Sequence, residues 1–107
     1  MDIYIADVLF NEGADSKVYP ALVIEVGGEK VVVFKVTSQY KSQSAQIKKL
    51  YYPIKEWEKA VLKKCSYVDT HKLYRLAKRW LFSRKAIGKL TDIDRLDLFK
   101  FINQLKK

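Results

Sequence analysis

The sequence is poor in the residues that bind metals and form disulfides. Its 107 residues include one cysteine, Cys65, and one histidine, His71. A single cysteine excludes a disulfide within the chain and fits a reducing compartment, and no acidic cluster has the spacing of metal ligands. Glycine-rich phosphate-binding loops and the sharp turn that presents a nucleophilic serine are also missing. We therefore expect no metal, no cofactor and no serine-hydrolase chemistry.

Long hydrophobic runs and a secretory leader are likewise lacking. No apolar run approaches the roughly 18 residues of a membrane helix, and the first residues, M-D-I-Y-I-A-D, lack the basic start of a signal peptide. The composition is 49% hydrophobic and 31% charged, which is typical of a folded globular protein. We expect a cytoplasmic protein without a membrane segment, folded as a single domain over residues 1–107.

Acidic residues are scarce in the part of the chain where basic residues gather. The net charge is +9, but residues 1–34 have a balance of −4, residues 35–62 of +4, and residues 63–89 of +8, with Asp69 as their one acid. A basic region on a small domain is typical of a site for a polyanion, most often nucleic acid. A basic surface that serves only solubility is the alternative interpretation.

Runs of β-branched and aromatic residues predict five strands. These runs are Ile3–Phe10, Ala21–Val26, Val31–Thr37, Leu50–Ile54 and Ser66–Leu76. The second and third are joined by G-G-E-K, and we expect Gly27 and Gly28 to adopt the positive φ values of a tight hairpin. Residues 39–49 are expected to form a polar loop.

Two segments have apolar residues at helical spacing. In the first, K-E-W-E-K-A-V-L, a short middle helix is predicted to bury Ile54, Trp57 and Val61 on one face. In the second, Thr91 is placed to cap a C-terminal helix. The predicted buried face of that helix consists of Leu96, Phe99, Ile102 and Leu105. The whole pattern predicts a mainly β fold of the α+β class, a small antiparallel barrel with these two helices appended.

The strand that ends at Thr37 is followed by S-Q-Y-K-S-Q-S and not by the usual turn residues. Hydroxyls, amides and lysines at this place suit the cleavage of RNA without a metal, because RNA supplies its own nucleophile, the 2′-OH beside the scissile phosphate. The protein then needs donors for the phosphorane and groups that move two protons. Thr37, Ser38 and nearby lysines or tyrosines are candidates for these functions.

Five short motifs follow one another along the chain. They are D-I-Y-I-A-D-V-L-F, Y-P-A-L-V-I from Tyr19, V-T-S-Q from Val36, I-K-E-W-E-K-A-V-L-K-K-C-S-Y-V from Ile54, and I-G-K-L-T from Ile87. In order and spacing they resemble the MazF/PemK family of toxin–antitoxin ribonucleases over nearly the whole chain. The resemblance implies a small antiparallel SH3-like barrel of the MazF/PemK/CcdB type.

The resemblance also implies a function and partners. Members of the family are homodimers that cleave single-stranded RNA sequence-selectively and without a metal, leaving a 2′,3′-cyclic phosphate and a 5′-OH. Each is paired with a cognate acidic antitoxin, whose poorly ordered tail would cover the basic groove. In this chain, the resemblance implies that Thr37 brings a hydroxyl into the RNA groove.

One departure from the family pattern concerns catalysis. The family has a catalytic arginine just before P-A-L-V, and this chain has Tyr19 there. We expect Lys17 or Tyr19 to supply the missing arginine's function while Thr37 orients or donates to the phosphate. The alternative is a catalytically weakened relative that binds nucleic acid or an antitoxin. A second departure, A-V-L at Ala60–Leu62 where the family has A-G-L, is expected to change packing only.

RNA binding is expected near the end of the third strand and on the later basic strand. The predicted contacts are Ser38, Gln39, Lys35, Lys41, Lys72 and Arg75. For any single one of the four cations, ordinary surface charge is an equally good interpretation. A third possibility, a scaffold protein whose basic surface aids solubility, predicts no salt-dependent binding of RNA.

Overall fold

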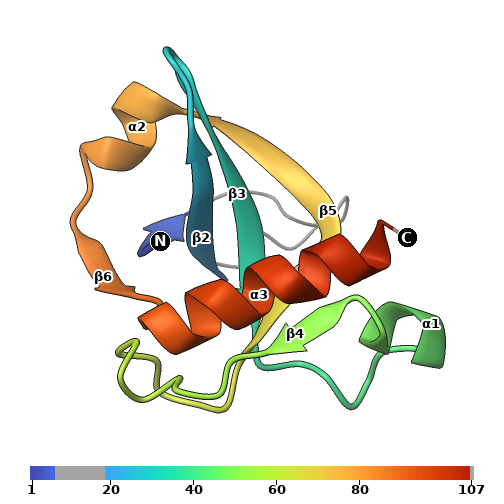
Figure 1. Cartoon of the computed structure of the whole chain (residues 1–107). Coiled ribbons are helices and arrows are strands. Elements are labelled where there is room, and N and C mark those ends of the chain that lie inside the picture. Colours follow the sequence, from blue (N-terminus) through green and yellow to red (C-terminus); the bar gives the residue numbers. More distant parts are fainter. Residues whose placement is uncertain (7–18, 107) are drawn as a thin grey trace.

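A computed structural model describes residues 1–6 and 19–106 of the chain (Figure 1). The strands are β1 Asp2–Ala6, β2 Tyr19–Val26, β3 Lys30–Thr37, β4 Tyr51–Pro53, β5 Tyr67–Ala77 and β6 Ala86–Lys89. The helices are α1 Ala45–Lys48, α2 Lys78–Phe82 and α3 Asp92–Leu105. The six strands form one antiparallel sheet in the order β4-β5-β3-β2-β1-β6. The predicted mainly β, α+β fold class with a C-terminal helix is confirmed.

Four of the predicted strands correspond to β2, β3, β4 and β5. The first predicted strand is confirmed over Asp2–Ala6, and its remainder, like Lys17, lies outside the described residues. β6 has no counterpart among the predicted elements because it is short and contains Gly88. A side chain at Gly88 would clash with the carbonyl oxygen of Ala60, so glycine allows β6 to approach the turn that precedes β5.

The β2–β3 hairpin forms as predicted, but its glycines act differently. No glycine in residues 1–6 and 19–106 has a positive φ, so that prediction is wrong for Gly27 and Gly28. Gly27 N donates a hydrogen bond to Lys30 O at 2.9 Å, and a Cβ on Gly27 would lie 3.0 Å from the same oxygen. Glycine at this position therefore permits a close backbone approach and not a left-handed conformation.

The sheet carries apolar side chains on both faces because residues alternate along each strand. On one face, Phe34 and Val36 of β3 belong to a core that includes Leu98 of α3. On the other face, Val31 and Val33 belong to a smaller core with Leu81 of α2. Figure 1 shows α3 running across the sheet and α2 directly after the end of β5.

Residues 55–61 form a series of turns and not the predicted middle helix. Leu62 N donates to Trp57 O at 3.0 Å, and Val61 has a φ of 63°. A β-branched residue rarely adopts this conformation, which interrupts any helix at that position. Trp57 packs against the core as predicted, whereas Val61 is 62% exposed.

A buried carboxylate of α3 holds these turns in place. Asp94 is fully buried, and its Oδ1 accepts hydrogen bonds from Tyr52 Oη at 2.6 Å and Lys55 N at 2.9 Å. Its Oδ2 accepts from Glu56 N at 2.8 Å. Burial and the hydrogen bond to Asp94 raise the pKa of Tyr52 far above its usual value. Thr91 caps α3 as predicted, because its Oγ1 accepts from Asp94 N at 3.4 Å.

α3 turns a different face to the core from the one predicted. The apolar residues that pack against the core are Leu98, Phe101 and Ile102. The predicted residues Leu96, Phe99 and Leu105 are instead exposed, and only Ile102 was correctly placed. Asp94 lies one helical turn before Leu98 and shares its face, so the true core face contains a charged residue. No helix in the described part of the chain is long and apolar enough to cross a membrane.

The polar segment at residues 39–49 contains one helical turn. α1 begins after Ser44, whose Oγ accepts a hydrogen bond from Ile47 N at 3.3 Å. A serine in this position satisfies a backbone N–H that the helix itself leaves without an acceptor. The prediction of a loop throughout this segment is therefore wrong at Ala45–Lys48.

Candidate nucleic-acid interface

The end of β3 places two polar side chains on the sheet face opposite α3. Lys35 and Thr37 follow Val31 and Val33 at every second position, so the four residues share one face. Both polar residues are largely buried. Gln39 N donates a hydrogen bond to Thr37 Oγ1 at 3.1 Å. Because this hydroxyl acts as an acceptor here, its own hydrogen can be donated to another acceptor.

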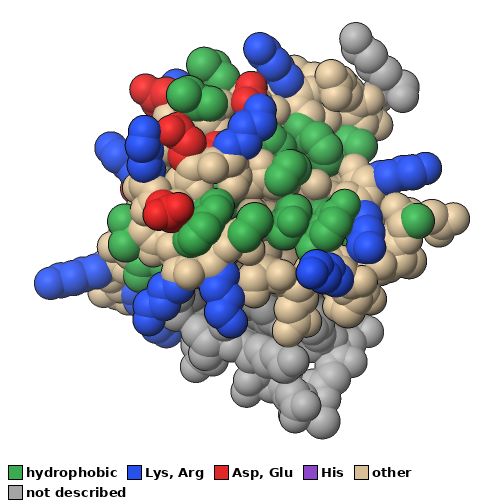
Figure 2. All heavy atoms as spheres, turned by 90° about the horizontal axis from the view of Figure 1, so that it is seen from below, with side chains coloured by type: hydrophobic (Ala, Val, Ile, Leu, Met, Phe, Trp, Pro, Cys, Tyr) green, Lys and Arg blue, Asp and Glu red, His purple; other side chains and the backbone are tan. Residues whose placement is uncertain are grey.

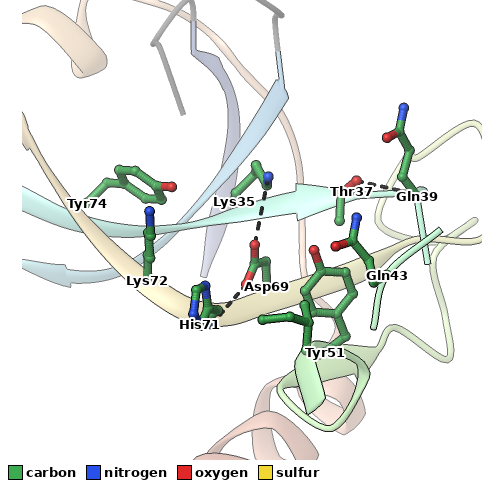
Figure 3. A pocket seen from close by; sticks show the side chains of 10 residues that line it. Lys35, Thr37, Gln39, Gln43, Tyr51, Asp69, His71, Lys72 and Tyr74 are labelled. Carbon is green, nitrogen blue, oxygen red and sulfur yellow. Dashed lines mark hydrogen bonds and ion pairs between the residues drawn. The ribbon is translucent and has the colours of Figure 1, made fainter. Parts of the chain in front are cut away.

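Lys35 and Thr37 line a pocket of about 370 Å³. Figure 3 shows them beside Asp69, with Lys72 and Tyr74 at one end of the pocket and glutamine side chains near Thr37 at the other. The residues come from β3, β4, β5 and the loop that contains α1, so the pocket exists only in the folded sheet. Ammonium, hydroxyl and amide groups in one pocket suit an oxyanion such as a phosphate.

The floor of this pocket holds an ion pair. Lys35 pairs with Asp69 across β3 and β5, and Lys35 Nζ lies 3.8 Å from Asp69 Oδ2. The two side chains are 11% and 10% exposed, so water screens their interaction weakly. Asp69 Oδ1 accepts a further hydrogen bond from His71 N at 2.9 Å. Asp69, the one acid in residues 63–89, therefore lies beside Lys35, a predicted RNA-binding residue.

Tyr74 lines the same pocket and has an altered acidity. Burial raises the pKa of its hydroxyl, and the negative charge of Asp69 raises it further. Tyr74 therefore stays protonated at neutral pH and can donate a hydrogen bond. The register places Tyr74 opposite Val33, beyond an irregularity in the pairing of β3 with β5.

Four of the predicted site residues lie together, and the others do not. The four that line the polar pocket are Thr37, Lys35, Gln39 and Lys72. Ser38 and Lys41 line a neighbouring pocket. Arg75 pairs with Val32, whose side chain lies on the opposite face from Val33, so Arg75 points away from the polar pocket.

The two remaining predicted residues belong to the segment before the P-A-L-V-I motif. Lys17 and the side chain of Tyr19 lie outside the described part of the structure. The backbone of Tyr19 begins β2 and pairs with Ala6 of β1. Two residues later, Ala21 pairs with Lys35, so β2 starts near the end of β3 that carries Thr37.

Several pocket residues have no counterpart among the predicted site residues. Asp69, His71 and Tyr74 come from β5, and Gln43 and Tyr51 come from the segment before it. Alternation along β5 predicts that residues 69 and 71 share a face, but it does not predict which strand lies beside them. Their proximity to Thr37 depends on the pairing of β3 with β5, which are about 30 residues apart in the sequence.

Two further pockets adjoin the end of β3. An apolar pocket of about 500 Å³ is lined by Thr37, Ser38 and residues such as Leu62 and Ile87. A pocket of about 480 Å³ is lined by Ser38, Gln39 and two tyrosines. Seen from below, hydrophobic side chains, with tyrosine counted among them, gather across the middle of the surface (Figure 2). Lys and Arg side chains border this patch, and Asp and Glu side chains lie among them on one side of it.

Neither a metal centre nor a comparison with known proteins identifies this site. In residues 1–6 and 19–106, no group of three or more His, Cys, Asp or Glu side chains is arranged to hold a metal ion. No protein-family model matches the sequence, and no curated protein matches it.

Proposed function

We propose that this chain is a metal-independent, sequence-selective endoribonuclease of the MazF/PemK toxin type. It cleaves single-stranded RNA by attack of the 2′-OH and leaves a 2′,3′-cyclic phosphate and a 5′-OH. The observation that carries the proposal is the pocket at the end of β3, where the Thr37 hydroxyl lies with the cations Lys35 and Lys72. These are the donors that a developing phosphorane needs.

In the proposed reaction, the 2′-oxygen forms a bond to phosphorus while the bond between phosphorus and the 5′-oxygen breaks. Thr37 Oγ1 and the Lys72 ammonium group donate hydrogen bonds to the non-bridging oxygens as their charge increases. His71 accepts the proton of the 2′-OH, since histidine is the commonest general acid and base in enzymes. Tyr74, whose protonated hydroxyl lines the same pocket, donates a proton to the leaving 5′-oxygen.

The function of the family's arginine is assigned to Lys17 or Tyr19 by the motif resemblance alone. Two observations on the backbone support this part of the proposal. Tyr19 begins β2, and Ala21 of β2 pairs with Lys35. A side chain at the start of β2 is therefore near the strand end that carries Thr37.

The proposal extends to architecture and partners. It includes an SH3-like barrel of the MazF/PemK/CcdB type, a homodimer in the cytoplasm, and a cognate acidic antitoxin. The exposed apolar residues Ile93, Leu96 and Phe99 on α3 support contact with a second copy. The balance of +8 in residues 63–89 supports an acidic partner. A sedimentation mass of one 12.5 kDa chain at micromolar concentration would contradict the dimer.

A binding module without catalysis is the second candidate, and two observations favour it. Tyr19 stands where the family has its arginine, which removes a fixed positive charge. Lys35 forms an ion pair with Asp69, so its charge is partly neutralised before any RNA arrives. Such a module would bind RNA or an antitoxin and leave the RNA intact.

One experiment separates the two candidates. The purified protein is incubated with a mixed-sequence single-stranded RNA in EDTA, and the products are tested for a 5′-OH. Cleavage with that end supports the nuclease, whereas salt-dependent binding without cleavage supports the module. Tyr19→Arg restores the family residue and should raise the cleavage rate. If both wild type and Tyr19→Arg bind RNA without cutting it, the nuclease proposal is wrong.

A further inference from the structure

Three tyrosines from separate segments meet beside the polar pocket. Tyr40 lies in the loop after β3, Tyr51 in β4, and Tyr67 at the start of β5. The rings of Tyr40 and Tyr67 are stacked, with centroids 4.4 Å apart and 11° between their planes. The Tyr51 ring is tilted against both, at 6.3 Å from Tyr40 and 6.4 Å from Tyr67. Tyr51 is buried, whereas Tyr40 and Tyr67 are partly exposed.

The stacked pair forms one wall of a pocket of about 480 Å³. Its remaining polar lining comes from Ser38, Gln39, Lys41 and Ser42. Gln39 also lines the polar pocket that contains Thr37, so the two pockets adjoin at this residue. An aromatic wall and several hydrogen-bonding side chains thus lie directly beside the candidate phosphate site.

This combination fits a nucleobase. Single-stranded RNA is held by proteins through stacking of its bases on aromatic rings, while amides and hydroxyls bond to the base edges. The Lys48 Nζ of α1 lies over the Tyr40 ring, 5.0 Å from its centre, in a cation–π contact that a base stacked on this face would displace. The released ammonium group can then contact a phosphate of the bound strand. A pair of aromatic rings that served only to fill the core would be buried among apolar side chains. Tyr40 and Tyr67 are instead partly exposed, and their pocket is also lined by four polar side chains.

We propose that the Tyr40–Tyr67 pair is a base-stacking subsite for single-stranded RNA. It receives a base next to the phosphate that occupies the Thr37 pocket. Gln39 and Ser42 contact the edge of that base and contribute to sequence preference. The inference rests on the proposed function in one respect, namely that single-stranded RNA is the ligand, and it does not require that the RNA be cleaved.

The test measures binding by fluorescence anisotropy with two short single-stranded oligonucleotides of equal length. One is a 2′-O-methyl RNA with all its bases, and the other has the same backbone with abasic positions. The methyl groups block the 2′-oxygen, so binding is measured without cleavage. Wild type should bind the base-bearing strand more tightly, and Tyr40→Ala should reduce this preference by roughly 5- to 150-fold, the effect of losing one stacked base.

Three variants complete the test. Tyr40→Phe keeps the ring and should keep the preference, while Tyr40→Leu keeps apolar bulk without the ring and should lose it. Phe82→Ala removes an exposed aromatic ring on α2, away from the polar pocket and the tyrosine pair, and should leave the preference unchanged. Equal binding of both oligonucleotides by wild type, an unchanged preference in folded Tyr40→Leu, or no binding of either strand would overturn the proposal. Because the assay measures binding and not cleavage, its result tests the stacking proposal even if the protein is not a nuclease.

Discussion

Substituting Asp69→Asn removes one negative charge from the polar pocket and leaves most of its geometry in place. The amide oxygen of Asn still accepts the hydrogen bond from His71 N, which Asp69 Oδ1 accepts at 2.9 Å. The change falls on Oδ2, which lies 3.8 Å from Lys35 Nζ. The variant therefore tests how far Asp69 neutralises Lys35, with little disturbance of the β3–β5 pairing.

The ion pair sets the size of the expected effects. At 3.8 Å and an effective dielectric constant of about 20, two unit charges attract by ~4 kcal/mol. Loss of one partner from a buried pair costs about 3–5 kcal/mol, and because a tenth of each side chain is exposed, we expect the free energy of unfolding to fall by about 2–3 kcal/mol. A bound phosphate that recovers about a third of the attraction would tighten RNA binding by about tenfold.

The two effects have opposite signs and need two assays. Urea unfolding gives the stability, and anisotropy with the 2′-O-methyl RNA gives the affinity at low and moderate salt. Glu58→Gln makes the same change in net charge at an exposed turn position and should alter neither quantity appreciably. If the Asp69→Asn variant is destabilised but binds RNA no better than wild type, Lys35 does not contact the phosphate. That result would refute the expected gain in affinity.

Four further substitutions test three separate parts of the structure. Lys72→Ala should shallow the salt dependence of RNA binding by roughly 0.7 in slope, whereas Arg75→Ala, on the opposite face, should leave the slope unchanged. Val61→Gly should raise the free energy of unfolding by about 1 kcal/mol because glycine accepts the positive φ, and a lower urea midpoint would contradict this. Asp94→Ala leaves three hydrogen-bond donors without their acceptor and should lower that free energy by about 3–5 kcal/mol; a loss below ~1 kcal/mol would show that the carboxylate is not holding the turns.

The strands of the central hairpin were predictable because their residues interact locally. Val31–Thr37 is rich in β-branched residues and lies beside a glycine turn, and both its ends agree closely with β3. The middle helix failed for a tertiary reason. Trp57 and Val61 have helical spacing, but Asp94 of α3 binds the backbone N–H groups of Lys55 and Glu56 and holds that segment in turns. A partner about 40 residues away overrode the local pattern.

The candidate site was predictable only in part, for a related reason. Lys35 and Thr37 share a face by alternation along one strand, so their proximity follows from the sequence. The pairing of Lys35 with Asp69 depends on the register of two strands far apart in the chain, and an irregularity between Val33 and Lys35 shifts that register. That irregularity also helps to set the positions of Lys72 and Arg75, which the sequence alone assigned to one surface.

The measurement that tests the central claim most directly is the rate of RNA cleavage in EDTA by wild type and Thr37→Val. Valine keeps the shape of threonine without the hydroxyl. We predict 5′-OH products from wild type and a rate lower by on the order of 10² to 10³ in the variant, with RNA still bound. Thr70→Val removes a hydroxyl on β5, outside the polar pocket, that donates to Leu50 O. It controls for the loss of a structural threonine hydroxyl and should cleave like wild type. Equal rates for wild type and Thr37→Val would contradict the claim that this hydroxyl takes part in cleavage.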